Sequence, residues 1–362
     1  MYARPTTCGK DGYAFEHKQV GRFALPQAVL VNWLITGGCG FIGTALVRSL
    51  GQEGGHAVRV VDNFAVGTRE DLATAGGFAE VSPGEIGPMA PGEGVELVVG
   101  DIRDEELALL AAEDADVIVH LAANTGVGPS VEDPRGDCMS NVVGTLNYLE
   151  AARHKGVGRF VFASSGGTVI GETEPPINED MAPHPVAPYG ASKLAGEGYC
   201  SAYFQTFGIH AVALRFGNVY GPGSIHKVRN AVPRFITRPT RGEPIEIYGD
   251  GSQTRDYVYV DDLVRALRLA ATADGVGGET FQIATNAETS VQEMVEELLP
   301  VLAAANVKDV EVRHAAPRLG DVRRNYSDTS KAARMLGWRS ETDLEEGLQH
   351  TMDWFMDQPK GQ

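Results

Sequence analysis

The stretch Thr36-Gly37-Gly38-Cys39-Gly40-Phe41-Ile42-Gly43 follows a short apolar run and opens an amphipathic segment. Gly37 permits a tight turn, Gly40 lets a phosphate approach the backbone, and Gly43 lets a helix pack closely on a strand. The N-terminus of that helix would face the phosphate charge. The stretch therefore predicts a strand–turn–helix unit that binds a dinucleotide. A purely structural turn rich in glycine is the alternative.

The next predicted strand, Val58–Asp62, ends in an acidic residue. Asp62 stands about where a carboxylate would hold the hydroxyls of the adenosine ribose. No arginine directly follows it, and the carboxylate would repel a 2′-phosphate. The sequence therefore favours NAD over NADP.

Up to Phe216, short apolar runs alternate with amphipathic segments. The runs predicted as buried strands are Leu30–Thr36, Val58–Asp62, Val95–Val99, Asp116–Ala122, Arg159–Ser164, His210–Phe216 and Phe281–Ala284. The clearest helical pattern is Pro134–His154, in which Met139, Val142, Leu146, Leu149 and Ala152 recur about every 3.6 residues and Gly156 follows as a C-cap. This alternation predicts an α/β fold, a Rossmann-type doubly wound parallel sheet.

After Phe216 the pattern gives way to loops, short strands and a helical segment near Leu344–Phe355, which we expect to form a smaller C-terminal substrate-binding α/β cap. Gly76–Gly94 is rich in glycine and proline and is predicted to be a surface insertion. The predicted units are an N-terminal extension (1–29), an NAD-binding Rossmann domain (30–217, with 256–285 returning to it) and a substrate-binding domain (218–255 and 286–362).

The composition excludes several classes of function. A net charge of −17 argues against binding to nucleic acid or to an anionic membrane. No apolar run approaches the ~20 residues of a membrane span, and the charged N-terminal segment lacks the apolar centre of a signal peptide. The cysteines are dispersed without metal-ligand spacing, so we expect reduced thiols, no metal and a cytoplasmic protein. They are Cys8, Cys39, Cys138 and Cys200.

Tyr189-Gly190-Ala191-Ser192-Lys193 places a phenol and an ammonium on one face of a predicted helix, Tyr189–Phe207. A free tyrosine titrates near pH ~10 and is a poor base at neutral pH. The Lys193 ammonium and the positive nicotinamide ring of NAD would both favour the phenolate. The pair therefore predicts removal of a proton from a substrate hydroxyl while hydride leaves the same carbon.

The segment Phe160–Thr168 is a predicted buried strand that runs into small polar residues. Because ligands bind at the carboxyl ends of strands in open α/β sheets, a hydroxyl there could bond a substrate oxygen and share its proton. Alternatively, Ser164 and Ser165 satisfy backbone groups at the strand end.

The chain resembles the extended short-chain dehydrogenase/reductase family, and within it the UDP-glucose 4-epimerase-like enzymes, from about Leu30 to the C-terminus. The resemblance rests on motifs in order: TGGCGFIG, Asp62, GDI at Gly100–Ile102, HLAA at His120–Ala123, FASSGGTVIG, YGASK and RFGNVYGP. It implies that Tyr189 and Lys193 are the catalytic pair. It also implies that the cofactor contacts are Gly37, Gly40, Phe41, Ile42, Gly43, Asp62, Asn63, Asp101, Ile102, Leu121, Ala122, Ala123, Asn141, Tyr189 and Lys193.

The catalytic hydroxyl does not align uniquely. Counting back from Val169 and Gly171 puts Gly166 where relatives carry a catalytic Ser or Thr, whereas counting forward along the strand puts Ser165 there. We select Ser165, with Thr168 as the second candidate. The usual tyrosine after the valine is replaced by Ile170.

The same loop separates reactions within the family. Dehydrating relatives carry an Asp-Glu pair there and decarboxylating relatives a glutamate, but Gly166-Gly167-Thr168 contains no acid. The resemblance therefore implies an isomerase, which epimerises a UDP-sugar at C4 through a 4-keto intermediate and keeps its NAD bound. A sugar-nucleotide reductase or dehydratase, and a noncatalytic NAD-binding regulator, are the alternatives.

The resemblance also implies a set of substrate contacts. These are Ser165, Tyr189, Asn218, Val232, Arg255, Arg318, Asp321 and Asn325. Arginine suits a diphosphate because its planar fork can bind phosphate bidentately. Asn325 falls where the family discriminates hexose size, and the basic run His226, Lys227 and Arg229 could meet a sugar carboxylate. UDP-glucose, UDP-N-acetylglucosamine and UDP-glucuronate all remain open.

Relatives pair the helices that match Pro134–His154 and Tyr189–Phe207 into a four-helix bundle across a two-fold axis. We therefore expect a homodimer, the commonest oligomer. The competing interpretation is that the apolar faces of both helices pack within one subunit.

Overall fold

The computed structural model describes residues 31–90, 92, 94–224, 230–317 and 322–358. Its larger part is built on an eight-stranded sheet in the order β12-β7-β6-β5-β1-β2-β4-β3, in which every neighbouring pair is parallel. The strands are β1 (Asn32–Thr36), β2 (Ala57–Asp62), β3 (Ala79–Val81), β4 (Gly94–Val99), β5 (Val117–His120), β6 (Arg159–Ser165), β7 (His210–Phe216) and β12 (Thr280–Ile283).

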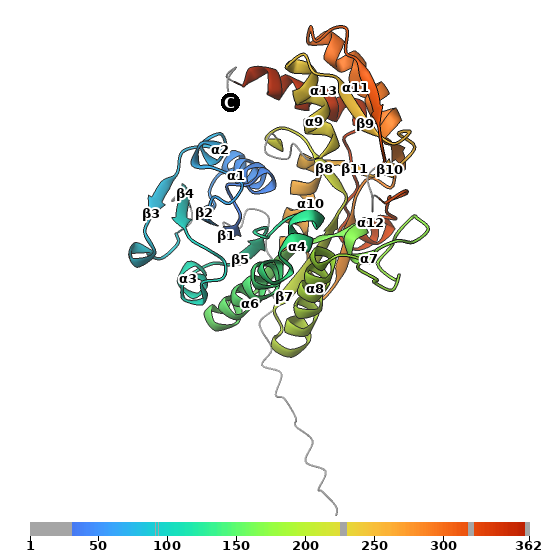
Figure 1. The fold of residues 1–362 in the computed structure, drawn as a ribbon. Coiled ribbons are helices and arrows are strands. Elements are labelled where there is room, and N and C mark those ends of the chain that lie inside the picture. The colour runs from blue at the N-terminus through green and yellow to red at the C-terminus, as the bar shows by residue number, and fades with distance from the viewer. Residues whose placement is uncertain (1–30, 91, 93, 225–229, 318–321, 359–362) are drawn as a thin grey trace, which may run out of the picture.

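Helices cover both faces of this sheet (Figure 1). α1 (Phe41–Glu53) and α10 (Val260–Thr272) pack on one face, and α3 (Glu105–Ala111), α6 (Gly144–Lys155) and α8 (Pro188–Phe207) on the other. Strand residues alternate between the two cores, since Trp33 and Ile35 belong to the first and Leu34 to the second. The predicted doubly wound α/β fold is confirmed.

A C-terminal part of short strands and helices lies beside the sheet (Figure 1). Its elements are β8 (Asn218–Tyr220), α9 (Ala231–Thr240), β9 (Ile245–Tyr248), β10 (Thr254–Arg255), β11 (Tyr257–Tyr259), β13 (Thr289–Ser290), α11 (Val291–Ala304), β14 (Val312–Ala315), α12 (Ser330–Met335) and α13 (Leu344–Asp357). The chain returns to the sheet in between, through α10 and β12.

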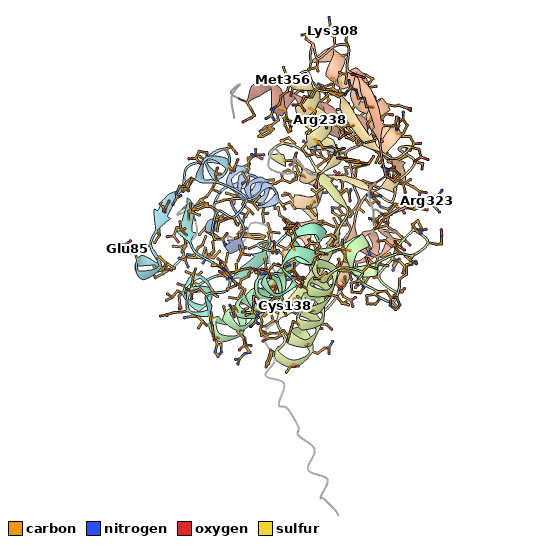
Figure 2. All side chains as sticks on the ribbon, viewed as in Figure 1. Glu85, Cys138, Arg238, Lys308, Arg323 and Met356 are labelled. Carbon is orange, nitrogen blue, oxygen red and sulfur yellow. The ribbon has the colours of Figure 1, made fainter. Side chains whose placement is uncertain are left out.

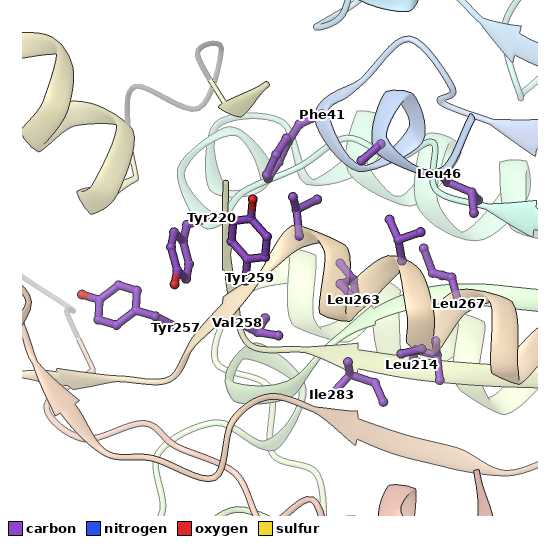
Figure 3. Close-up of a cluster of buried hydrophobic side chains, with 14 of the residues drawn as sticks. Phe41, Leu46, Leu214, Tyr220, Tyr257, Val258, Tyr259, Leu263, Leu267 and Ile283 are labelled. Carbon is purple, nitrogen blue, oxygen red and sulfur yellow. The ribbon is translucent and has the colours of Figure 1, made fainter. Parts of the chain in front are cut away.

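The first core joins the two parts. Figure 3 shows Phe41 of α1, Tyr220 of β8 and Tyr259 of β11 close to one another, with Leu263 of α10 and Leu214 of β7 continuing the cluster between that helix and the sheet. Lys308 and Met356, labelled in Figure 2, mark the C-terminal part, and Glu85 marks the opposite edge, beside β3. No helix among the described residues is long and apolar enough to cross a membrane.

The structure corrects the interpretation of Gly76–Gly94. This segment contains β3, which pairs with β4 and extends the sheet by one strand, as well as a 3₁₀ turn, η1 (Pro83–Glu85). β3 spans three residues, of which two are exposed and none is buried. It therefore lacks the apolar alternation from which a strand is predicted.

The predicted helix Pro134–His154 is correct in extent but not uniform. It consists of α5 (Pro134–Cys138), a π-helical turn, η2 (Met139–Val143), and α6, and it ends at Gly156 in the left-handed conformation, as predicted. Because a π-helical turn is wider than an α-helical one, it rotates the direction in which the side chains of the helix point. Met139, the first residue of the apolar period, is 41 % exposed, whereas Asn141 is buried.

Candidate active site

A cavity of about 800 Å³ opens at the carboxyl ends of β1, β2, β5, β6 and β7 and is closed on its other side by the C-terminal part. It brings together most of the predicted cofactor contacts. Those that line it are Gly37, Gly40, Phe41, Ile42, Gly43, Asp62, Asn63, Leu121, Ala122, Ala123, Tyr189 and Lys193. Three predicted substrate contacts besides Tyr189 also line it: Ser165, Asn218 and Arg255.

The turn between β1 and α1 has no room for a side chain at Gly37 or Gly43. Gly37 has φ of +73°, and a Cβ there would stand 2.8 Å from the Ala122 nitrogen. A Cβ on Gly43 would stand 2.3 Å from the Gly37 oxygen, so α1 can approach β1 only with glycine here. A Cβ on Gly40 would meet only that same oxygen, at 3.3 Å, and Gly40 offers no side-chain cap to α1. The first turn of α1 thus suits the negative charge of a pyrophosphate.

Asp62 ends β2 with its carboxylate held by backbone donors. Oδ2 accepts a hydrogen bond from the Cys39 nitrogen at 2.9 Å, and Oδ1 accepts one from the Phe64 nitrogen at 2.8 Å. Burial raises the pKa of Asp62, and these donors partly offset the effect. Each oxygen keeps a second lone pair. The orientation therefore fits the predicted contact with ribose hydroxyls.

Asp101 and Ile102 are outside the set of residues that line the cavity but adjoin it. The Asn63 amide donates to Asp101 Oδ2 at 3.1 Å, and Arg103 binds the same carboxylate at 2.8 Å. The hydrogen bonds from Arg103 lower the pKa of Asp101 to about 2. Ile102 is buried against Gly144 of α6.

Asn141 likewise lies behind the cavity wall. Its Oδ1 accepts from the Asn124 nitrogen at 2.7 Å, and its Nδ2 lies within hydrogen-bond distance of the Asn124 oxygen, Asp137 Oδ1 and Ser192 Oγ at 3.0, 2.9 and 3.1 Å. Ser192 Oγ in turn donates a hydrogen bond to the backbone carbonyl oxygen of Tyr189 at 3.0 Å. Asn141 thus ties the loop after β5 to the first turn of α8.

Tyr189 and Lys193 lie on one face of α8. Lys193 is buried, with 3 % of its surface exposed. Its Nζ donates a hydrogen bond to the backbone oxygen of Ala163 at 2.8 Å and lies 5.8 Å from the centre of the Tyr189 ring. Burial, with a smaller contribution from Asp137, raises the pKa of Tyr189 to about 12. Tyr189 is therefore a phenol at neutral pH in this structure.

The three candidate hydroxyls have different environments. Ser164 Oγ donates to Glu197, whose carboxylate is held bidentately by Arg215 at 2.8 Å, so Ser164 belongs to a buried structural network. Ser165 is half-buried at the end of β6 and lines the cavity. Thr168, in the short helix α7 (Gly166–Ile170), does not line the cavity, and its Oγ1 is buried with no hydrogen-bond partner.

The remaining predicted substrate contacts are distributed unevenly. Val232 is 2 % exposed in the core, whereas Ala231, Arg234 and Phe235 of the same helix, α9, line the cavity. Asn325 does not line the cavity but lies against the turn after Ser165, because a Cβ on Gly167 would stand 2.4 Å from its Nδ2. Arg318, Asp321, His226, Lys227 and Arg229 lie outside the described residues.

Arg234 was not predicted, although it stands two residues after the predicted contact Val232. Its guanidinium lies 4.7 Å from the centre of the Tyr248 ring and donates to the Glu246 oxygen. Val232, Phe235 and Ile236 have helical spacing, which would have left Arg234 on another face of the helix. Tyr248 also borders a second cavity of about 790 Å³ in the C-terminal part, lined by residues such as Asp250, His314 and Arg323.

The family model of the NAD dependent epimerase/dehydratase family matches residues 33–284. The chain belongs to that family. The UDP-glucose 4-epimerase of Mycolicibacterium smegmatis is 39 % identical over 326 residues, which are 89 % of this chain and 97 % of that protein. Several dTDP-glucose 4,6-dehydratases are also similar to this chain, at 30–32 % identity.

Two solved structures of UDP-glucose 4-epimerases are similar to this chain over 90 % of its length. The Thermus thermophilus UDP-glucose 4-epimerase in complex with NAD is 36 % identical with a TM-score of 0.74, covering 90 % of this chain and 99 % of that one. The Thermotoga maritima UDP-glucose 4-epimerase with UDP-glucose is 35 % identical with a TM-score of 0.78, covering 90 % and 98 %.

NAD is the cofactor of this epimerase/dehydratase, and the described residues fit it. The glycine turn would hold the pyrophosphate, and Asp62 would hold the adenosine ribose. Tyr189, Lys193 and Ser165 stand at the same cavity beyond the turn. The arrangement can therefore bring a sugar hydroxyl to a tyrosine and a serine beside a hydride carrier.

Proposed function

We propose that this enzyme epimerises a UDP-sugar at C4 through a 4-keto intermediate. The observation that carries the proposal is the cavity in which Tyr189, Lys193 and Ser165 meet, followed by α7, whose sequence Gly-Gly-Thr-Val-Ile has no carboxylate. Bound NAD supplies the acceptor and donor of hydride. With no acid on α7 to expel a hydroxyl, the 4-keto sugar would rotate in the cavity and take the hydride back on its other face, which inverts C4.

Tyr189 would take the proton of the C4 hydroxyl in the oxidation and return it in the reduction. The buried Lys193 ammonium lowers the cost of the phenolate that this requires. Ser165 would hydrogen-bond the same oxygen and fix its distance from Tyr189. Arg234 and Arg255, at the far side of the cavity, suit the diphosphate.

Two further observations support a UDP-sugar. The 39 % identical relative is a UDP-glucose 4-epimerase, and the similar Thermotoga maritima structure contains UDP-glucose. Asn325, where the resemblance implies discrimination of hexose size, lies behind the cavity against Gly167, in the turn that follows Ser165. Glucose, N-acetylglucosamine and glucuronate therefore form the panel of sugars to test.

The deciding experiment incubates the purified protein with each UDP-sugar without added NAD and resolves the products by chromatography and proton NMR. We expect a C4 epimer with no net NADH. A 6-deoxy-4-keto product would indicate a dehydratase, and stoichiometric conversion of added cofactor would indicate a reductase. Bound NAD with no change in any sugar would favour the regulator.

We also propose a homodimer. Large apolar side chains are exposed on the two helices of the predicted bundle and on the helix α4 (Val127–Glu132) that packs against them: Met139 on η2, Tyr199 and Phe207 on α8, and Val131 on α4, each between 37 % and 60 % exposed. Packing within one subunit leaves these side chains in water. A second copy across a two-fold axis would cover them.

A further inference from the structure

A buried ion pair lies next to the cavity, between side chains that the proposed reaction does not use. Glu197 of α8 is 7 % exposed and Arg215 of β7 is 4 % exposed. The guanidinium binds the carboxylate at two points, Nε to Oε1 and Nη2 to Oε2, each at 2.8 Å. Because arginine stays protonated in proteins, the two form an ion pair. The same carboxylate accepts a hydrogen bond from the hydroxyl of Ser164, a residue that lines the cavity.

Stability does not explain this pair. Taking two charges out of water costs free energy that their attraction often only balances, and apolar side chains of similar volume are often as stable in such a position. Arg215 Nη1 is also buried and has no hydrogen-bond partner among the described residues, which adds to the cost. The position of Glu197 therefore needs another explanation.

Glu197 continues the face of α8 that carries the catalytic pair. Tyr189, Lys193 and Glu197 follow one another at intervals of four residues, so they stand on one side of the helix about one turn apart. Lys193 Nζ donates to the backbone oxygen of Ala163, and Glu197 binds the hydroxyl of the next residue, Ser164. Two charged groups of α8 thus hold the two residues of β6 that precede the proposed catalytic serine.

Glycines bring α8 close to the same segment of the chain, and α8 packs against β6, β7 and α7 (Figure 1). A Cβ on Gly196 would stand 2.3 Å from Cζ of Phe162, and a Cβ on Gly190 would stand 2.0 Å from the backbone oxygen of Thr168. The helix therefore contacts this segment on both sides of Ser165. Apolar packing is not directional, whereas charged hydrogen bonds fix the geometry of a contact.

We propose that Glu197 is a positioning residue of the active site: its carboxylate, anchored by Arg215, holds Ser164 and so fixes Ser165 relative to Tyr189. The proposal rests on the proposed function, in which Ser165 and Tyr189 bind the same reacting oxygen. That oxygen must meet both groups while hydride moves, and a misplacement of about 1 Å can slow such a step about 10²-fold. Loss of the link should therefore slow the chemistry more than it weakens binding.

The test compares kcat and KM, with the UDP-sugar that the wild-type protein converts, in variants of the link. Glu197→Gln removes the charge that Arg215 binds, Ser164→Ala removes only the hydroxyl, and the double variant shows whether both side chains act through one bond. Glu96→Gln is the matched control. It breaks the ion pair of Glu96 with the buried Arg59 in the same sheet, and neither of these two residues lines the cavity.

We expect kcat to fall about 10–10²-fold in Glu197→Gln and in Ser164→Ala, with KM and bound NAD close to wild type. The double variant should be no slower than the slower single variant, because the two changes remove the same link. Glu96→Gln should keep the wild-type kcat. The inference is overturned by wild-type kcat in both single variants, by an equal loss in Glu96→Gln, or by losses that multiply in the double variant. If Glu197→Gln does not fold, Ser164→Ala decides.

A second measurement needs no sugar. Hydrogen exchange of the NAD-loaded protein, followed by mass spectrometry, should be faster at residues 162–168 in Glu197→Gln and Ser164→Ala, and unchanged there in Glu96→Gln. If the wild-type protein converts no UDP-sugar, the proposed function fails, while hydrogen exchange still decides whether Glu197 holds the end of β6 in place. Wild-type exchange in both link variants contradicts the positioning role.

Discussion

At the scale of single residues, chemistry depends on what surrounds each polar group. Tyr189 and Lys193 lie four residues apart, and the proposed effect of the ammonium on the phenol depends on its burial, its bond to the Ala163 oxygen and its position 5.8 Å from the centre of the tyrosine ring. The sequence predicts the pair. It does not predict that Asp137 is buried, since a carboxylate in the first turn of the predicted helix Pro134–His154 is usually solvated and this one is buried only by the packing of α5 against α8.

Replacing Tyr189 with Phe tests the proposed base. We expect turnover to fall by about 10²–10⁴-fold, the usual contribution of a general acid–base group. NAD should remain bound, because its pyrophosphate and ribose contacts lie at the glycine turn and Asp62. Turnover is followed by NMR and bound NAD by absorbance after denaturation. Wild-type turnover in this variant would exclude Tyr189 as the base.

Ser165→Ala and Thr168→Val separate the two hydroxyl candidates. The Ser165 change should slow turnover by about 10²-fold if its hydroxyl bonds the reacting oxygen. The Thr168 change removes a buried hydroxyl without a partner and keeps its shape, so turnover should match wild type and stability should not fall. Kinetics and urea unfolding check both. Slowing by Thr168→Val alone would reverse the assignment.

At the scale of elements, the strands, the helix limits and the C-cap at Gly156 could be predicted because each leaves a local pattern. β3 could not, because its three residues carry no apolar alternation. The π-helical turn was also missed, because one wider turn hardly alters a 3.6-residue period over the whole helix, yet it turns Met139 outward and Asn141 inward. In α9 the predicted contact Val232 is buried in the core, whereas Arg234 lines the cavity.

Gly43→Ala tests how α1 is seated on the sheet. The added Cβ would stand 2.3 Å from the Gly37 oxygen and 2.5 Å from the Gly38 Cα, both backbone atoms that cannot rotate away. We expect a loss of about 1–3 kcal/mol in the free energy of unfolding and weaker binding of NAD. Gly51→Ala is the matched control, because a Cβ there meets nothing within 4 Å and helix propensity favours alanine. Equal stability of the two variants would contradict this account of the turn.

At the scale of the whole molecule, the exposed apolar side chains on α8 and its neighbouring helices predict the state of assembly. Sedimentation equilibrium of the wild-type protein should give twice the chain mass. Val131→Glu places a charge at a 60 % exposed position on the proposed interface and should shift the protein toward monomer without unfolding it. Val186→Glu, at a 73 % exposed position outside these helices, is the control. A monomeric wild-type protein would remove the dimer proposal.

The order in which the strands are made also has a consequence for synthesis of the chain. β12 completes the sheet beside β7, yet the ribosome makes it about 60 residues later. At ~5–20 residues per second, β7 waits roughly 3–13 s with one edge open. An open edge of a nascent sheet is a surface for pairing with other strands. Protection of that edge by chaperones during translation is therefore expected to govern how much of this enzyme reaches its native state.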